Sequence, residues 1–380
     1  MTGFRTPIPP RPGAYCVTNN SDSVTIDSCT IVMDSSTTGF DISAVLISDD
    51  YENDLGEGAG VDYLTVSNST IIGGYYAINL EGNGTNDFGL GHVISGNTFM
   101  GFDLSGIYVD DLQDFTFTGN TLQAAAAATA DGFYAFDLND YTIEGNTINV
   151  QDYGLYISDG NDGFTPSSNS TIINNMVSSS SDYGMYLNDV VKTDVYHNTS
   201  VGSPGIAIND DEDLDIKNNI FVSDADFAFE SLDDPDISTT IDYNLYYKSG
   251  AGNAFEILST TYTDLAAWQT GDPSRNVNSL EGDPVFVSAT DLHLIGGLAN
   301  DVGDNSVGVT MDIDGDTRPA SGATAVDIGA DEYTPPAGDL ELIAADFIKG
   351  PCLTTNDSIE LLVQNLVSAV DFSVDPLTAN

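Results

Sequence analysis

The chain has 380 residues, with 59 acidic side chains against 8 basic ones and a formal net charge of −51. This charge argues against nucleic acid or an anionic membrane surface as a partner, because no basic stripe is present to displace counterions. No run of 18 apolar residues occurs, so we expect no direct membrane insertion. The acidity instead favours solubility in salt, and cation binding.

Residues 1–13 are proline-rich and are expected to be irregular. Over residues 14–257 one pattern recurs nine times: an apolar residue, a polar corner three residues later, and usually another apolar residue two positions beyond. The corners are Cys29, Ser69, Asn97, Asn120, Asn146, Asn175, Asn198, Asn219 and Asn244, spaced 21 to 40 residues apart. Repeats of this length are typical of solenoids or propellers. Because each unit offers three short strands, the pattern favours the coils of a parallel β-helix, about ten in number.

Asparagine at the repeated corner predicts a ladder in which each side-chain amide bonds to the next coil. Its expected role is structural. The three cysteines, Cys16, Cys29 and Cys352, cannot form a disulfide framework. We expect Cys29 to be a buried thiol rather than a partner of Cys16, although the sequence leaves that pairing open.

A third strand precedes each corner and alternates apolar with polar residues, as in Gly154-Leu155-Tyr156-Ile157. Period two places Leu155 and Ile157 inside and Tyr156 outside. The predicted outward column on successive coils is Asn79, Tyr108, Asp137, Tyr156 and Tyr186. Sugars could stack on such rings while Asp and Asn bind their hydroxyls. Alternatively, exposed tyrosine is simply favoured on a β-surface.

Aspartates follow this strand on five consecutive coils, at Asp111, Asp140, Asp159, Asp189 and Asp210. Stacked carboxylates repel one another, and hard cations with oxygen ligands, Ca²⁺ first, would relieve that repulsion. The alternative is that each aspartate caps its own tight turn. We favour turn capping at most positions and a bound ion at one or two.

Catalytic signals are weak. Asp110, Asp137 and Asp159 could supply the carboxylate pair of a glycoside hydrolase, but any groove in so acidic a chain would contain one. The lysines form no cluster of the kind a lyase would need. His92, His197 and His293 have no catalytic neighbours in sequence, so packing is the expected role of each.

Residues 258–333 depart from the repeat and are expected to form further coils and a cap. Thr263 to Gln269 has helical spacing and contains Trp268, which is expected to plug the open end of the core. The segments that follow are DPVFV (283–287), DLHL (291–294), DIDGDTRP (312–319) and VDIGADEY (326–333). The Gly in DIDGD is misplaced for an EF-hand loop, so this segment is expected to form a turn.

In this order, from AAWQ to the DIGADEY-type end motif, the segments resemble the carboxy-terminal end of bacterial secreted right-handed parallel β-helix proteins, the group that includes pectate-lyase-like folds. The resemblance covers residues 14–333, with a departure at Gly297 to Asp301. It implies a right-handed solenoid, secretion, and a polysaccharide groove along the tyrosine-bearing sheet. Members range from lyases and hydrolases to adhesins, so no single reaction is implied. The polygalacturonase residue set is absent.

Residues 334–338 have the composition of a linker, and residues 339–380 resemble the opening strands of an immunoglobulin-like module of bacterial surface proteins. We expect this module to be incomplete, and a signal peptide and an amino-terminal cap to lie outside the chain. The sequence therefore predicts an all-β, acidic segment of a larger extracellular protein, monomeric in itself, that contacts glycans and has Ca²⁺ as its one candidate cofactor. The alternatives are a polysaccharide-degrading enzyme, more plausibly a hydrolase than a lyase, and a passive spacer.

Overall fold

The computed structural model describes residues 15–17, 23–33, 43–47, 61–82, 88–126, 128–161, 169–334, 340–347 and 359–365. The expected irregular segment 1–13, most of the linker and much of the carboxy-terminal module lie outside these residues. The chain divides into two compact units, Met1–Glu332 and Tyr333–Asn380.

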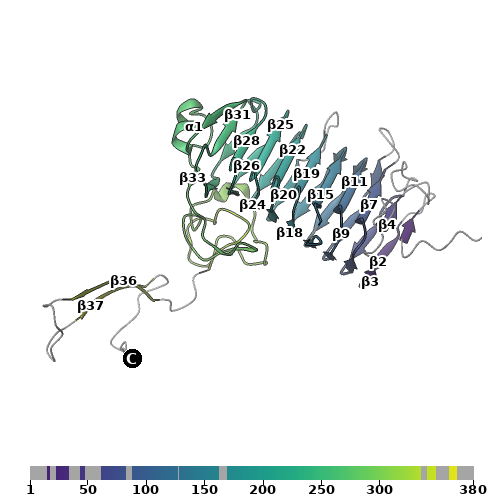
Figure 1. Cartoon of the computed structure of the whole chain (residues 1–380), viewed down its shortest axis with the longest axis horizontal. Helices are drawn as coiled ribbons and strands as arrows, with labels where there is room; N and C mark the ends of the chain where they lie inside the picture. The colour runs from purple at the N-terminus through teal and green to yellow at the C-terminus, as the bar shows by residue number, and fades with distance from the viewer. Residues whose placement is uncertain are drawn as a thin grey trace, which may run out of the picture. The chain divides into compact units, whose positions relative to one another are not determined.

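The first unit is a stack of coils in which each coil contributes one strand to each of three parallel sheets, here named A, B and C (Figure 1). Sheet A consists of β1 (Tyr15–Val17), β4 (Ser43–Ile47), β7 (Tyr76–Glu81), β11 (Ser105–Asp110), β15 (Asp131–Phe136), β19 (Leu155–Ser158), β22 (Met185–Asn188), β25 (Ile206–Asn209), β28 (Phe229–Ser231), β31 (Phe255–Ile257) and the antiparallel β32 (Thr260–Tyr262). The prediction of three short strands per coil is confirmed.

Sheets B and C meet at the repeated polar corner. Sheet B consists of β2 (Thr25–Asp27), β5 (Thr65–Ser67), β9 (Val93–Ser95), β13 (Thr116–Thr118), β17 (Thr142–Glu144), β20 (Ser170–Ile173), β23 (Thr193–Tyr196), β26 (Asp215–Lys217) and β29 (Thr240–Asp242). Sheet C consists of β3 (Thr30–Val32), β6 (Thr70–Ile72), β10 (Thr98–Met100), β14 (Thr121–Gln123), β18 (Thr147–Val150), β21 (Met176–Ser179), β24 (Thr199–Val201), β27 (Ile220–Ser223), β30 (Leu245–Lys248) and β33 (Leu280–Glu281). A small sheet of β8 (Gly89–Leu90), β12 (Leu112–Gln113) and β16 (Leu138–Asn139) lies between sheets A and B in the chain order.

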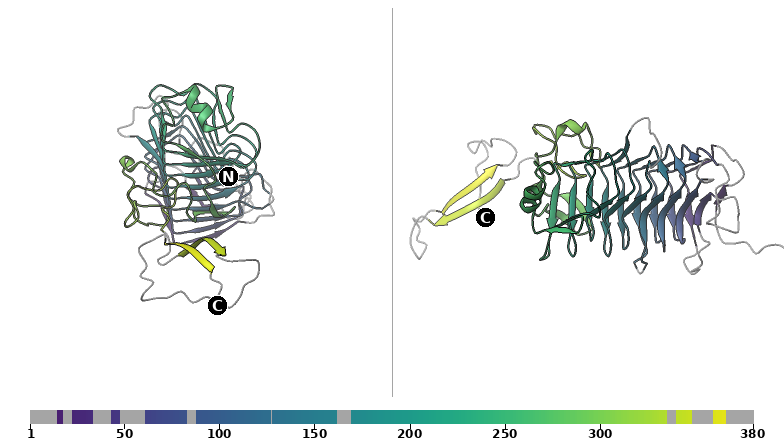
Figure 2. Two further views of the ribbon diagram at one scale, coloured as in Figure 1. Left: turned by 90° about the vertical axis from the view of Figure 1, so that its left-hand side faces the viewer. Right: turned by 90° about the horizontal axis from the view of Figure 1, so that it is seen from above.

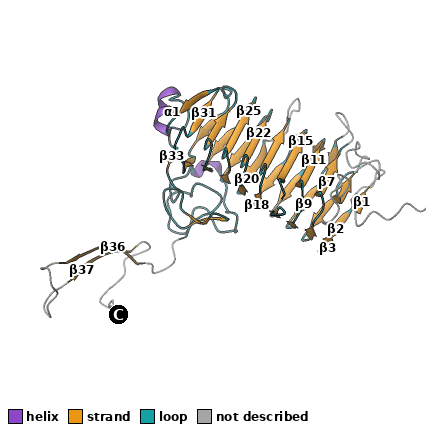
Figure 3. Cartoon of the chain, viewed as in Figure 1, coloured by secondary structure: helices purple, strands orange, loops and turns teal. Residues whose placement is uncertain are grey.

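One apolar core runs through the column, because the inward residue of each strand stacks on its counterpart in the next coil. Ile107, Leu155 and Met185 of sheet A are fully buried, as are Ile143 and Ile172 of sheet B. The view along the stack shows the strands surrounding this interior (Figure 2), and strands make up most of the regular structure (Figure 3). Alternation within each strand therefore fixes which side chains the outer faces present.

The asparagine ladder is present. At its centre the Asn146 side chain accepts from the backbone N–H of Asn120 (2.9 Å) and donates to Asn175 Oδ1 (2.9 Å) and the Phe117 carbonyl (2.8 Å). The column continues to Ser279, whose hydroxyl accepts from Asn244 (3.0 Å), a rung that the sequence pattern did not reveal. The expected burial of Cys29 is wrong: its free thiol lies exposed at the amino-terminal end of the ladder.

The helix α1 (Leu265–Gly271) closes the far end of the core. Asp264 caps it by accepting from the Ala267 N–H (2.8 Å). Trp268 is almost completely buried, and its ring lies 5.1 Å from those of both Phe229 and Phe255. The predicted helix and the predicted plug are both present.

The end motif, here residues 283–332, returns along the corner between sheets B and C. It contains β34 (Phe286–Ser288), β35 (Asp291–Leu294) and the 3₁₀ helix η1 (Asn305–Val307). The corner residue Asn174 donates to the Met311 carbonyl (2.8 Å), and Asn218 to that of Asp304 (3.0 Å). The second unit is described only by an antiparallel pair, β36 (Leu340–Phe347) and β37 (Ile359–Asn365).

The interior of the end motif is polar and is held together by an ion pair and by hydrogen bonds to one aspartate. Arg318 and Glu332 form a buried ion pair (3.1 Å). Asp312 accepts from the backbone N–H groups of Asp314 (3.0 Å), Asp316 (2.7 Å) and Glu332 (2.9 Å). The DIDGD segment is therefore a turn organised by its first aspartate, as the sequence predicts, and this turn is tied to the final segment of the motif.

Candidate functional site

An aromatic column runs along the outer face of sheet A. The strand register aligns Asn79, Tyr108, Tyr134, Tyr156, Tyr186, Ala207 and Glu230 on successive coils. The prediction that Asp137 occupies this column is wrong, because the register places Tyr134 there. Asn79 is fully buried and its amide donates to Glu81 (3.4 Å), so the prediction that it is exposed is also wrong.

The tyrosines form two adjoining stacks. Tyr134 lies nearly parallel to Tyr156, with ring centroids 4.4 Å apart and an interplanar angle of 13°, and less closely to Tyr108 at 6.2 Å. A second stack pairs Tyr153 with Tyr183 at 5.5 Å, and Tyr183 also stacks on Tyr186 at 4.9 Å. All are half-buried. Because the rings cover one another's faces, they offer ring edges and phenol groups to solvent.

Carboxyl groups of raised pKa border these rings. Burial, with the charge of Asp152, raises the pKa of Asp131 to about 7. Glu230 stands at the carboxy-terminal end of the aromatic column, where burial and the charges of Asp226 and Glu256 raise its pKa to about 7. Burial and nearby acids, Glu230 among them, raise the pKa of Tyr183 to about 12. Near neutral pH these acids are therefore partly protonated and can both donate and accept hydrogen bonds, while the phenols remain neutral donors.

A column of aspartates marks the turn after sheet A. Its rungs are Asp111, Asp137, Asp159, Asp189 and Asp210, each with left-handed backbone at φ between 44° and 56°. Backbone bonds fix the register: the N–H of Asp137 donates to the Ser158 carbonyl and that of Asp159 to the Asn188 carbonyl. Asp140 was expected in this column and is not, because it lies in the next turn, where burial and the charge of Asp114 raise its pKa. Left-handed backbone favours Asp, Asn and Gly, so local conformation explains the repetition by itself.

Two of the three carboxyls proposed for catalysis come together. Asp110 and Asp137, with Asp111, present oxygen atoms within 4.8 Å of one another. Burial, followed by the charges of Asp111 and Asp137, raises the pKa of Asp110 to about 6. Asp159 lies one rung beyond Asp137 in the turn column, outside this group. The arrangement can hold a cation among three carboxylates or share a proton between two of them.

The histidines divide into two kinds. His92 and His197 are fully buried, which confirms their packing role, and burial lowers the pKa of His92 to about 4. His293 instead lies partly exposed on β35 beside Asp291, Asp314 and Asp331. Sequence reasoning missed this cluster. The one local signal was the Asp291-Leu292-His293 spacing, which places Asp291 and His293 on the same side of a strand.

A parallel solenoid of three sheets with one continuous core is a β-helix, and its outward columns are set by that architecture. The sequence matches the family model described as "Right handed beta helix region" over residues 12–169, 55–221 and 105–264, which together span more than half of the chain. The chain therefore belongs to the right-handed β-helix family.

No curated protein matches the sequence significantly. Among solved structures, the Streptococcus pneumoniae surface protein and adhesin PfbA is similar at 12% sequence identity and a TM-score of 0.36, with 70% of this chain and 66% of that chain covered. The chain thus spans slightly less than two thirds of that protein. Among the described residues, no helix is long and apolar enough to cross a membrane.

Proposed function

We propose that this β-helix is part of an extracellular, surface-associated protein and binds a glycan along the outer face of sheet A. The observation that carries the proposal is the pair of tyrosine stacks bordered by carboxyl groups of raised pKa. An extended chain of sugars would lie along the column and meet one rung about every 4.8 Å.

Recognition would come from ring edges, phenols and carboxyls rather than from sugars lying flat on exposed rings. Tyr134 and Tyr156 occupy each other's faces at 4.4 Å, so no sugar ring fits between them. Their hydroxyl groups can instead donate to sugar oxygens, while Asp131 and Glu230 bond to sugar hydroxyls. Since the chain is highly acidic, neutral or cationic sugars fit this face better than uronic acids do.

Calcium would assist glycan binding from the turn that follows sheet A. Asp110, Asp111 and Asp137 bring three carboxylates within 4.8 Å, and an all-oxygen group of this kind suits Ca²⁺. If the ion binds there, calcium will raise the melting temperature of the wild type, and Asp137→Asn will reduce that rise. An equal rise in melting temperature in both proteins would show that calcium does not bind at this turn.

A glycan array with matched variants tests the binding site. Tyr134→Ala/Tyr156→Ala should lower binding about tenfold or more, since losing 1.4 kcal/mol of contact has that effect. Tyr63→Ala, at an exposed tyrosine outside sheet A, should leave binding unchanged. Circular dichroism checks the fold of each variant. Equal signals from all three proteins, or no signal from the wild type, would reject the site.

One observation favours hydrolysis as a second candidate. Asp110 has its pKa raised to about 6 and lies beside Asp137, as a general acid and its carboxylate partner would. A separation below 4.8 Å is nearer the ~5–5.5 Å of retaining glycosidases than the wider spacing of inverting ones. Release of reducing sugars that disappears in Asp137→Asn would favour hydrolysis. If neither binding nor release is detected, a passive spacer remains.

A further inference from the structure

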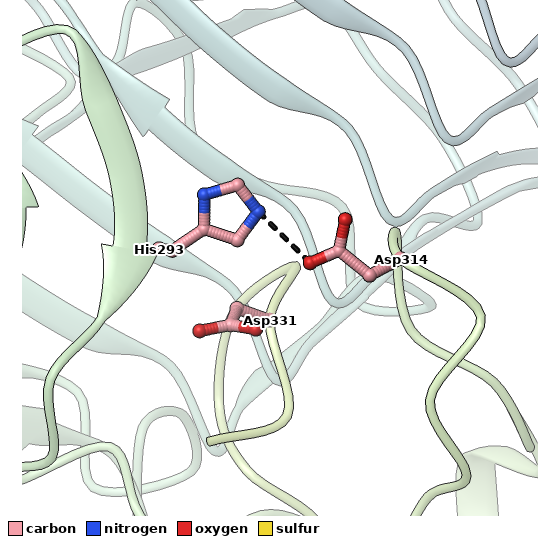
Figure 4. Close-up of side chains that lie close together, drawn as sticks. All are labelled: His293, Asp314 and Asp331. Atoms are coloured by element: carbon pink, nitrogen blue, oxygen red, sulfur yellow. Dashed lines mark ion pairs between the residues drawn. The ribbon is translucent and has the colours of Figure 1, made fainter. Parts of the chain in front are cut away.

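Four polar side chains converge on one side of the end motif. His293 and Asp291 come from β35. Asp314 comes from the DIDGD turn and Asp331 from the final segment, and Figure 4 shows both beside His293. The ligand atoms of His293, Asp314 and Asp331 lie within 4.8 Å of one another, and His293 Nε2 is 3.0 Å from Asp314 Oδ2. We propose that His293, Asp314 and Asp331 bind one divalent transition-metal cation of the Zn²⁺ type.

The geometry is close to what such an ion requires. With Zn–N and Zn–O bonds near 2.1 Å, tetrahedral ligand atoms lie about 3.4 Å apart. The distances between the observed ligand atoms need to shorten by at most about 1.4 Å from their 4.8 Å limit. Asp314 is exposed and can move inward, whereas Asp331 is buried and held by the Leu294 N–H at 2.7 Å.

The imidazole is already oriented. Asp291 Oδ1 lies 2.5 Å from His293 Nδ1, and this contact directs Nε2 toward Asp314. A carboxylate on the remote ring nitrogen is the usual support of a metal-binding histidine, because it fixes the tautomer and the ring orientation. Asp291 is therefore a positioning residue in this site.

The supporting backbone is held in place before any ion binds. Asp312 bonds to the N–H groups of Asp314 and Glu332, and the Ile313 N–H donates to the Ala330 carbonyl (3.1 Å). These bonds fix the segments that carry Asp314 and Asp331 relative to each other. Little conformational entropy is then lost on binding.

The ligand set and its surroundings select the class of ion. One imidazole nitrogen with two carboxylates suits Zn²⁺ and similar cations, whereas Ca²⁺ takes six to eight oxygen ligands. Two hollows adjoin the cluster: one of about 240 Å³ is lined by Asp291 and His293, and another of about 580 Å³ by Asp314 and Glu144. The ion would therefore keep solvent access and open coordination positions.

Equilibrium dialysis of the full chain, stripped with EDTA and then exposed to ZnCl₂ in excess CaCl₂, tests the site. The calcium occupies the acidic surface, and His293 is the accessible imidazole because the other two histidines are buried. We expect one tightly bound Zn²⁺ per chain. His293→Gln and Asp314→Asn should each lower affinity at least tenfold, and Asp291→Asn about 10- to 100-fold.

Asp316→Asn is the matched control, because it removes an exposed charge from the same turn without touching the cluster. Its zinc binding should equal that of the wild type. Co²⁺ should give a visible absorption band that His293→Gln abolishes. If His293→Gln disturbs the fold, the exposed Asp314→Asn keeps the test valid. The proposal would be overturned if the wild type binds no Zn²⁺, or if His293→Gln and Asp314→Asn both bind it as tightly as the wild type does. The cluster would then be a proton-dependent ion pair.

Discussion

Two polar columns run along this β-helix, and they differ in how their side chains are bonded. In the asparagine ladder each side-chain amide is uncharged and forms hydrogen bonds with the next rung and with the backbone. In the column from Asp111 to Asp210 each rung carries a carboxyl at a left-handed turn beside solvent. The first column stabilises the fold, whereas the second follows from the left-handed backbone at each turn and is the place where we propose that calcium binds. Repetition alone therefore does not separate structural from functional residues.

Removing one rung of the ladder should have the largest effect. Asn146→Ala leaves the Asn120 N–H and the Phe117 carbonyl without this partner in a buried corner, and it removes one of the two donors to Asn175 Oδ1, which still accepts from the backbone N–H of residue 146. At about 1–3 kcal/mol for each unsatisfied group, the free energy of unfolding should fall by about 3–5 kcal/mol. Urea denaturation measures this loss.

The control for that prediction is Asn146→Ser, since Ser69 and Ser279 already occupy rungs of the same column. It should cost less than the alanine variant. A loss below about 1 kcal/mol in Asn146→Ala would show that water replaces the amide, and the contrast between the columns would fail.

The acids bordering the tyrosines should make stability depend on pH. The pKa of Asp131 is raised to about 7, so between its ordinary value and pH 7 the folded protein holds more protons than the unfolded chain. The free energy of unfolding should therefore fall as pH rises through this window, with the penalty complete above about pH 7.

Asp131→Asn should flatten that part of the profile and raise stability at pH 8 relative to wild type. Asparagine keeps an oxygen to accept from the Tyr153 N–H, as Asp131 does at 3.2 Å. Glu144→Gln, at an exposed position of sheet B, serves as the control. Urea midpoints at pH 5 and pH 8 decide the matter, and parallel profiles for wild type and Asp131→Asn would contradict the prediction.

Neutralising the aspartate column should have the smallest effect. In Asp159→Asn/Asp189→Asn/Asp210→Asn, asparagine accepts the left-handed backbone and like-charge repulsion is relieved. Without calcium we expect a gain of less than about 1 kcal/mol, because solvent screens these charges. Thermal denaturation in EDTA measures it. A marked loss would show that these carboxylates cap their turns more strongly than the amide can.

The sequence predicted the repeating features within one coil correctly, and its errors about which residues share an outward column concern the alignment of residues between coils. The inward positions, the ladder and the Trp268 plug follow from local periodicity, and all three are present. For the coil that contains the strand Asp131–Phe136, the sequence analysis placed the outward residue and the turn aspartate three residues too far along the chain, because turn lengths differ between coils. It therefore chose Asp137 where the structure has Tyr134, and Asp140 where the structure has Asp137.

By itself the sequence determined the coil, since a repeated apolar pattern with an amide corner can bury its residues only by stacking. Tertiary structure decided which side chains share a site. Strand pairing aligned Tyr134 with Tyr156. Folding of the end motif brought three of its own residues, His293, Asp314 and Asp331, together. The physical reason is that burial is encoded within each coil, whereas contacts between segments depend on loop lengths and docking that no single segment specifies.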